Sequence, residues 1–199
     1  AHEGEWVEPR GVNYHGYTLD ELPPNGQGFA ALMMLNILKQ TDVRQFERGS
    51  PELFHYMVEA KRLAFEAMAG TFADPDFADI PLDALLSDGF AKRQFARIRK
   101  DAVIEPKFLA VPLEGEGDTT YLTVVDKSGL MVSLIQSNYR GMGSGLVPKG
   151  LGFMLQDRGE LFSLEDGHPN VYAPGKRPFH TITPAFAMRG DAPCLRCGL

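Results

Sequence analysis

Residues 117–126 carry the sequence Gly-Asp-Thr-Thr-Tyr-Leu-Thr-Val-Val-Asp, in which two threonines stand immediately before an alternating apolar run. A threonine hydroxyl is a weak nucleophile unless a neighbouring base takes its proton. If the chain is cut before Thr119, the new α-amine of Thr119 lies beside its own hydroxyl and can act as that base. The reference pKa of an α-amine is about 7.7–8.0, so much of it is neutral near pH 7. Such a cut would make Thr119 a candidate N-terminal nucleophile at the start of a strand.

The residues that follow predict a β-hairpin that positions this threonine. Residues 119–126 and 130–137 each alternate in side-chain type, and the loop Lys127-Ser128-Gly129 ends in the glycine that a three-residue hairpin loop favours. In the register that this loop sets, Thr119 faces Ser137 with Cβ atoms about 5 Å apart, so Ser137 can donate a hydrogen bond to the threonine oxygen. The same pattern also fits an ordinary Thr–Ser pair on a hairpin. On the opposite face four apolar side chains are expected to supply a core: Leu122, Val124, Val132 and Leu134.

Glycines are concentrated after the hairpin, in Gly141-Met142-Gly143-Ser144-Gly145 and again at Gly150 and Gly152. Such a loop lets the backbone approach a ligand closely and can present N–H groups to an anion. Phosphate binding is disfavoured, because no lysine follows in Walker spacing and no Gly-x-Gly-x-x-Gly motif opens a helix. Two interpretations stay open: the wall of a pocket beside Thr119, or a tight connection to a strand expected over residues 151–155.

Several short motifs occur in a fixed order along the chain. Residues 117–126 are followed by Gly143-Ser144-Gly145, residues 152–163 and Pro174-Gly175-Lys176-Arg177-Pro178, and are preceded by Gly16-Tyr17, Glu21-Leu22-Pro23-Pro24 and Ala73-Asp74-Pro75-Asp76-Phe77. This series resembles the γ-glutamyltranspeptidase family from about Pro9 to Pro184, with the junction between large and small subunit at Thr119. An ordered series of motifs is far more specific than any one of them.

The resemblance implies an α+β fold, the αββα sandwich of the N-terminal nucleophile hydrolases, of which this chain would carry an incomplete piece. Residues 1–118 would form the C-terminal, mostly helical part of the large subunit. Residues 119–199 would form the N-terminal part of the small subunit, within the same structural domain. The resemblance also implies a precursor that cuts itself between Asp118 and Thr119, with Ser137 as the hydroxyl that supports the nucleophile.

The chemistry implied by the resemblance is acyl transfer from γ-glutamyl amides such as glutathione. The Thr119 oxygen attacks the amide, an acyl-enzyme forms, and water or an amino acid then takes the acyl group. No metal or organic cofactor is needed. The implied partners are the small-molecule amide and the rest of the large and small subunits. The compartment stays open, because typical transpeptidases are periplasmic or extracellular whereas a side branch of the family can be cytoplasmic.

Several positions depart from the transpeptidase pattern. The family has an asparagine two residues beyond the supporting hydroxyl, where this chain has Tyr139, with Asn138 one residue earlier. Leu161 stands where an aspartate would bind the α-amine of the substrate. His180 and Thr181 replace two serines that hold the α-carboxylate. Because an aliphatic side chain cannot stabilise an ammonium group, Leu161 favours an acyl group that lacks one.

These departures resemble the side branch of transpeptidase-like proteins and cephalosporin-acylase relatives, in which the acyl group can be glutaryl. The resemblance implies that Arg158 and His180 bind a carboxylate, Arg158 through a two-pronged contact. The alternative interpretation makes Arg158 a solvated surface residue and His180 a hydrogen-bonded structural histidine. The candidate substrate-binding residues are therefore Asn138, Tyr139, Arg158, His180 and Thr181.

Composition limits the classes of function. The 199 residues are 44% hydrophobic and 23% charged with a net charge of −6, which is typical of a globular protein and gives no support for nucleic-acid binding. The longest apolar stretch, residues 29–38, is far below the roughly 20 residues of a membrane helix. Cys194-Leu195-Arg196-Cys197 has no second pair and the histidines lack ligand spacing, so ordinary thiols are favoured over a redox pair or half a zinc site.

Upstream of Thr119 the pattern predicts helices. One is expected over about residues 28–39 and, being apolar around most of its girth, is expected to be buried. A second begins after the N-cap Ser50, and a third runs from Ser87 towards Lys100. Residues 73–77 predict a turn, and residues 101–117 form an acidic, glycine-containing segment suited to bending at the cut. The inner stripe of the second helix is expected from Leu53, Met57, Ala60, Leu63, Ala64 and Ala67.

The resemblance further implies that most of the large subunit lies before Ala1, including an arginine that helps hold the substrate carboxylate. A Gly-Gly stretch that supplies oxyanion-hole N–H groups is expected after residues 184–186, where the chain instead continues towards residues 193–199 without one. Loss of one such donor typically lowers a rate by about 10²–10³. Two hypotheses from different classes are therefore kept: an acyl-transferring hydrolase, and a non-catalytic remnant that retains the Thr119 motif.

Overall fold

The computed structural model describes residues 4–105 and 117–197 and combines helices with two antiparallel sheets, as an α+β fold requires. Short 3-10 helices lie at η1 (Val43–Gln45) and η2 (Arg158–Leu161). The helices and strands are, in chain order, β1 (Arg10–Tyr14), β2 (Tyr17–Glu21), α1 (Phe29–Leu38), α2 (Pro51–Thr71), α3 (Leu82–Leu85), α4 (Asp88–Phe95), β3 (Gly117–Val125), β4 (Met131–Arg140), β5 (Ala185–Arg189) and β6 (Ala192–Cys197).

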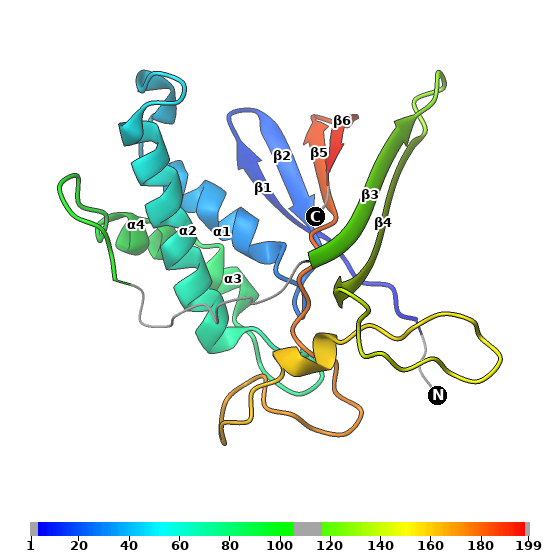
Figure 1. Ribbon diagram of the computed structural model, residues 1–199. Coiled ribbons are helices and arrows are strands. Elements are labelled where there is room, and N and C mark those ends of the chain that lie inside the picture. The colour runs from blue at the N-terminus through cyan, green and yellow to red at the C-terminus, as the bar shows by residue number, and fades with distance from the viewer. Residues whose placement is uncertain (1–3, 106–116, 198–199) are drawn as a thin grey trace.

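The elements are arranged in the order helices, four-stranded sheet, hairpin (Figure 1). The four-stranded sheet has the strand order β1-β2-β5-β6, so strands from the two ends of the chain pair directly, with Leu19 opposite Ala187. β3 and β4 form the second sheet. Because α1 contacts β1 and β2 while β4 contacts β6, the four-stranded sheet lies between the helices and the hairpin.

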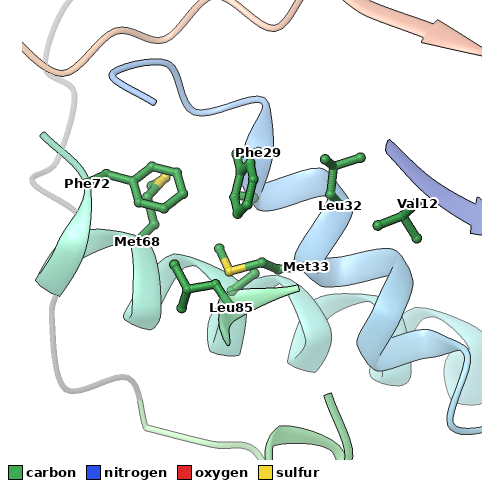
Figure 2. Packing of buried hydrophobic residues seen from close by; sticks show 9 residues of the cluster. Val12, Phe29, Leu32, Met33, Met68, Phe72 and Leu85 are labelled. Atoms are coloured by element: carbon green, nitrogen blue, oxygen red, sulfur yellow. The ribbon is translucent and has the colours of Figure 1, made fainter. Parts of the chain in front are cut away.

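The hydrophobic core lies between α1 and α2. Phe29, Leu32 and Met33 of α1 are fully buried. Figure 2 shows Phe29 beside Phe72, which follows the end of α2, and Leu32 beside Val12 of β1. The rings of Phe29 and Phe72 meet edge to face with centroids 5.7 Å apart. Burying one such side chain contributes about 1.5–3 kcal/mol, so α1 holds this half of the fold together. The predicted buried helix over residues 28–39 is confirmed.

α2 begins where the sequence predicts but is rotated from the expected stripe. Ser50 caps its first turn by accepting a backbone hydrogen bond at 3.2 Å. Met57, expected inside, is 44% exposed. The ring of Tyr56 is buried instead and stacks with the rings of Phe46 and Phe95, at centroid distances of 5.2 and 6.0 Å. The buried residues of α2 are Tyr56, Glu59, Ala60, Leu63, Ala64 and Met68.

α4 is shorter than the helix expected towards Lys100. Ser87 caps its start, where the side-chain oxygen accepts a backbone hydrogen bond at 3.1 Å. The helix ends at Phe95, because the backbone N–H groups of Arg97 and Ile98 bond to carbonyls only three residues back. Such bonds tighten the last turn into 3-10 geometry and close the helix.

Two further segments differ from expectation. Residues 151–155 are irregular rather than a strand, and pair only with the glycine-rich loop, through Leu155 N to Leu146 O at 2.9 Å. Upstream, the mostly helical expectation for residues 1–118 missed β1 and β2. β2 pairs with β5, so this sheet depends on a partner from the far end of the chain. The turn expected at residues 73–77 is present.

The outer face of the β3–β4 hairpin is exposed, which contradicts the core expected there. Leu122, Val124, Val132 and Leu134 have exposed fractions of 43%, 56%, 46% and 55%. Tyr121 and Ile135, on the other face, are half-buried. Burial therefore alternates along β4 as predicted, whereas β3 from Thr119 onward is exposed except at Tyr121, and no layer within residues 4–105 and 117–197 buries the outer face.

A buried ion pair joins the part of the chain before Thr119 to the part after it. Asp74 is 1% exposed and accepts hydrogen bonds from Arg177 Nη2 at 2.7 Å and from Arg177 N at 2.8 Å. Burial raises the pKa of Asp74, but the bonds from Arg177 outweigh it, so the net pKa is lowered. Neighbouring contacts across the same junction are Asn25 to Pro178 O, Gln27 to Thr181 O, and the bridge between Gly26 and His180.

We expect Arg177→Ala to lower the free energy of unfolding by about 3 kcal/mol, because the change leaves the Asp74 carboxylate buried without its cation. Urea titration of the purified protein measures it. Arg99→Ala is the matched control, since Arg99 and its partner Asp101 have side chains 68% and 74% exposed, and its expected effect is below about 0.5 kcal/mol. Equal losses of unfolding free energy in the two variants would show that the buried Asp74–Arg177 pair stabilises the fold no more than an exposed pair does.

Candidate active site

The β3–β4 hairpin brings Thr119 and Ser137 together in the predicted register. The two residues are ladder partners, and the same register continues to Val125 opposite Met131. The Thr119 hydroxyl donates to Ser137 Oγ at a distance of 2.9 Å. The side-chain oxygen of Ser137 also faces two N–H donors.

The side-chain oxygen of Ser137 lies within hydrogen-bond distance of three other groups. Besides the Thr119 hydroxyl, it accepts from Tyr139 N at 2.9 Å and from Arg158 Nη2 at 3.2 Å. These contacts fix the position of the Thr119 oxygen, which is the atom that attacks when a threonine acts as a nucleophile.

Arg158 is buried and is not the solvated surface residue that one interpretation proposed. Its exposed fraction is 3%, and its guanidinium carbon lies 5.1 Å from the centroid of the Tyr139 ring. Its Nε atom has no hydrogen-bond partner among the residues that the structure describes. Burial lowers the pKa of Arg158, but a guanidinium remains protonated at neutral pH. A positive charge therefore lies one hydroxyl group away from Thr119.

Tyr139 adopts a backbone conformation that is rare for a residue with a side chain. Its φ angle is +79°, and its ring lies between the guanidinium groups of Arg158 and Arg140, at 5.1 and 5.7 Å. Asn138, the residue before it, has no partner in the ladder, because the register shifts at this point. Asn138 and Tyr139 thus form a β-bulge directly opposite the peptide bond that precedes Thr119.

His180 and Thr181 lie on the segment that is bonded to residues 25–27. His180 Nδ1 accepts from Ile182 N at 3.1 Å, so the neutral ring carries its proton on Nε2. Burial, followed by the charge of Arg158, lowers the pKa of His180 to about 4. Near pH 7 His180 can therefore offer a carboxylate an N–H group but not a positive charge. The Thr181 carbonyl accepts from Gln27 Nε2 at 2.6 Å.

The predicted residues divide into a connected group and a more distant one. Thr119, Ser137, Tyr139 and Arg158 are joined by direct contacts, with Asn138 in the bulge beside them. The charge of Arg158 helps to lower the pKa of His180, and the Thr181 carbonyl accepts a hydrogen bond from Gln27. The backbone of Asp118 pairs with Tyr139. The acidic segment expected to bend before the cut includes residues 106–116, which lie outside the described residues.

Sequence reasoning missed Asp157. Its backbone N–H donates to Asn138 O at 3.2 Å, and its Oδ1 accepts from Arg140 N at 3.3 Å. An aspartate in a loop gives no such signal by itself. Within the described ranges no cluster of three or more His, Cys, Asp or Glu side chains could hold a metal, and no helix is long and apolar enough to span a bilayer.

Glu21, at the end of β2, lines a cavity of about 200 Å³ together with His180. The side chain is 2% exposed, and Oε2 has no hydrogen-bond partner among the described residues. Burial raises the pKa of Glu21 to about 7, against a smaller lowering by the Leu22 N–H. The Oε2 atom lies so close to Gly28 that a Cβ there would be 2.2 Å away. Ionisation of Glu21 thus places a charge inside the fold.

Comparison with known proteins places the chain in a family. The γ-glutamyltranspeptidase family model matches residues 1–199, and the chain belongs to that family. Among its relatives is the glutathione hydrolase-like YwrD proenzyme of Bacillus subtilis strain 168, 41% identical over 201 residues. Another is the oxamate amidohydrolase proenzyme of Klebsiella pneumoniae, 36% identical over 191 residues. The alignments cover 100% and 96% of this chain but only 37% and 35% of the two relatives.

A solved structure agrees with this placement. The cephalosporin acylase from Bacillus halodurans superposes with a TM-score of 0.81 at 38% identity, over 96% of this chain and 34% of that protein. The chain therefore spans about a third of the length of the proteins that it matches. The family resemblance that the sequence motifs indicated is confirmed.

We expect Glu21→Gln to raise stability at pH 8 and to change it little at pH 4. The folded-state pKa of about 7 lies above the ordinary glutamate value of 4.5, so the stability contributed by neutral Glu21 is full below about pH 4.5 and is lost as the pH rises through about 7. A shift of this size corresponds to on the order of 3 kcal/mol. Thermal unfolding from pH 4 to 8 measures it, with the exposed Glu47→Gln as control. Parallel pH curves for both variants would contradict it.

Proposed function

We propose that the protein containing this chain is an N-terminal threonine hydrolase that transfers acyl groups from γ-glutamyl amides, a glutathione hydrolase-like activity. The observation that carries the proposal is the contact of 2.9 Å between the Thr119 hydroxyl and Ser137 Oγ, beside the buried charge of Arg158. Relatives named glutathione hydrolase proenzyme, in Escherichia coli and other bacteria, support this class of chemistry.

The first step is activation by self-cleavage. The Thr119 oxygen attacks the carbonyl carbon of Asp118, the carbon–nitrogen bond breaks, and an ester bond to the threonine oxygen replaces it. The hydroxyl proton ends on the new α-amine. Water then hydrolyses the ester, which leaves a carboxylate on Asp118 and restores the Thr119 hydroxyl. The proenzyme names of the relatives agree with such a step.

Turnover uses the same oxygen. The neutral α-amine of Thr119 takes the hydroxyl proton while the oxygen attacks the acyl carbonyl, and the proton then passes to the leaving amine. The acyl ester on Thr119 is released to water or to an amino acid. Ser137 fixes the direction of the threonine oxygen. The guanidinium of Arg158 stabilises the negative charge that develops nearby.

The described layers fit three parts of an αββα sandwich. Helices, the four-stranded sheet and the hairpin follow one another in that order (Figure 1). A further helical layer, contributed by the rest of the large and small subunits, would cover the exposed apolar face of the hairpin. The Asp74–Arg177 pair and the β2–β5 pairing favour a single structural domain made from residues 1–118 and 119–199.

The charge of the site favours a second acyl class, one that carries a carboxylate but no α-ammonium, as glutaryl does. The Arg158 guanidinium attracts a carboxylate and repels an ammonium group. The Leu161 side chain offers no charge to an ammonium, and it lines a cavity of about 510 Å³ together with Phe162, Arg140 and Glu160. The names of the relatives, which include an oxamate amidohydrolase and acylases, agree with this class.

We expect the full-length protein to appear in an intact-mass spectrum as two chains, the second of which begins at Thr119. Thr119→Ala is expected to remain one chain, because it lacks the attacking oxygen. Ser137→Ala is expected to cleave more slowly, since Ser137 holds the Thr119 hydroxyl. A single uncut wild-type chain that a threonine-directed electrophile fails to label would instead identify a non-catalytic remnant.

The second acyl class predicts that the mature protein hydrolyses a glutaryl anilide faster than a γ-glutamyl anilide, as measured by kcat/KM. Leu161→Asp is expected to shift this ratio towards the γ-glutamyl compound by about 10-fold, since it adds a carboxylate for the α-ammonium. Leu161→Asn, similar in size but uncharged, is the matched control and is expected to shift it less. Faster turnover of the γ-glutamyl anilide by the wild type would contradict the preference for an acyl group without an ammonium. Glutathione hydrolase-like transfer would then remain as the activity.

A further inference from the structure

The β-bulge opposite the proposed cut is built from residues that the proposed mechanism does not use. Asp118 pairs with Tyr139 and Thr119 pairs with Ser137, so Asn138 is the extra residue. A bulge leaves its extra residue unpaired and disrupts the ladder locally. The disruption falls between Asp118 and Thr119 and not elsewhere along β3, which is regular from Thr119 to Val125.

Asp157 holds both sides of this bulge. Its backbone N–H donates to the Asn138 carbonyl at 3.2 Å, and its Oδ1 accepts from the Arg140 N–H at 3.3 Å. The two bonds span Tyr139, whose φ of +79° is the strained point of the strand. A strained conformation of this kind persists only where its surroundings impose it. Asp157 supplies two of the contacts that do so.

Gly143 packs closely against Asn138 of the bulge. A Cβ added at Gly143 would lie 2.6 Å from Leu155 O and 3.1 Å from the Cβ of Asn138. The φ of Gly143 is +60°, a region that residues with side chains rarely adopt. Asn138 therefore sits where it does because this position of the glycine-rich loop has no side chain. Gly145, in the same loop with φ +70°, has nothing within 4 Å of an added Cβ.

We propose that Asp157 and Gly143 are positioning residues for self-cleavage. They hold the Asn138–Tyr139 bulge in place, and the bulge keeps the peptide bond between Asp118 and Thr119 out of regular ladder geometry. The inference rests on the proposed function, since it concerns the same cut. In a regular strand the peptide is planar and held by its ladder partners, whereas attack by the threonine oxygen needs a carbonyl carbon that can become tetrahedral. The bulge gives that carbon room beside the attacking hydroxyl.

The test compares self-cleavage rates of full-length precursors by intact mass. We expect Gly143→Ala and Asp157→Ala to slow the cut by about 10²-fold, the effect of misplacing a reacting group by about 1 Å. Asp157→Asn keeps an oxygen that accepts from the Arg140 N–H and is expected to restore the rate to within about 3-fold of wild type. Gly145→Ala is the matched glycine control and is expected to cleave at nearly the wild-type rate, because its new Cβ meets no atom.

Thermal unfolding midpoints separate positioning from loss of fold. Slow cleavage in Asp157→Ala with a midpoint close to that of Asp157→Asn supports the inference, even where Gly143→Ala is unstable. Wild-type rates in both Gly143→Ala and Asp157→Ala would overturn it while leaving the proposed function intact. Slow cleavage in Asp157→Asn as well would also overturn it, because the hydrogen bond to Arg140 would then be irrelevant. A wild-type precursor that stays uncut overturns the proposed function and this inference together.

Discussion

The contact between the Asp74 carboxylate and Arg177 is the constraint on which the arrangement of the two halves depends. Asp74 begins the turn that follows α2, and Arg177 lies in the segment that leads to β5. Because the carboxylate is buried, its charge is tolerable only with that cation in place. Hydrogen bonds from Asn25 and Gln27 then hold the segment around His180 against the loop before α1. The four-stranded sheet then forms from strands at opposite ends of the sequence.

Within that frame the chemistry converges on one oxygen atom. Ser137 Oγ receives the Thr119 hydroxyl from β3, the Tyr139 amide from β4 and the Arg158 guanidinium from η2. Three elements thus meet at a single hydroxyl. The same convergence places a buried cation close to the proposed nucleophile, and that charge favours anionic acyl groups over cationic ones.

The hairpin that carries Thr119 has two unlike faces. Its inner face is half-buried towards β6, whereas its outer face presents Leu122, Val124, Val132 and Leu134 to solvent. Contiguous exposed apolar surface normally marks a place that another layer covers. The chain spans about a third of the length of the relatives that it matches, and the helical layer of the proposed αββα sandwich would cover this surface.

The sequence alone determined what depends on near neighbours. The Thr119–Ser137 register follows from a three-residue loop, the Ser50 and Ser87 caps from local hydrogen bonds, and the burial of α1 from its composition. Only the tertiary structure decided what depends on distant partners: the β2–β5 pairing, the rotation that exposes Met57, the burial of Arg158 and the clamp of Asp157 on the bulge. Such contacts join segments whose separation no local pattern encodes, so their energies appear only once the chain has folded.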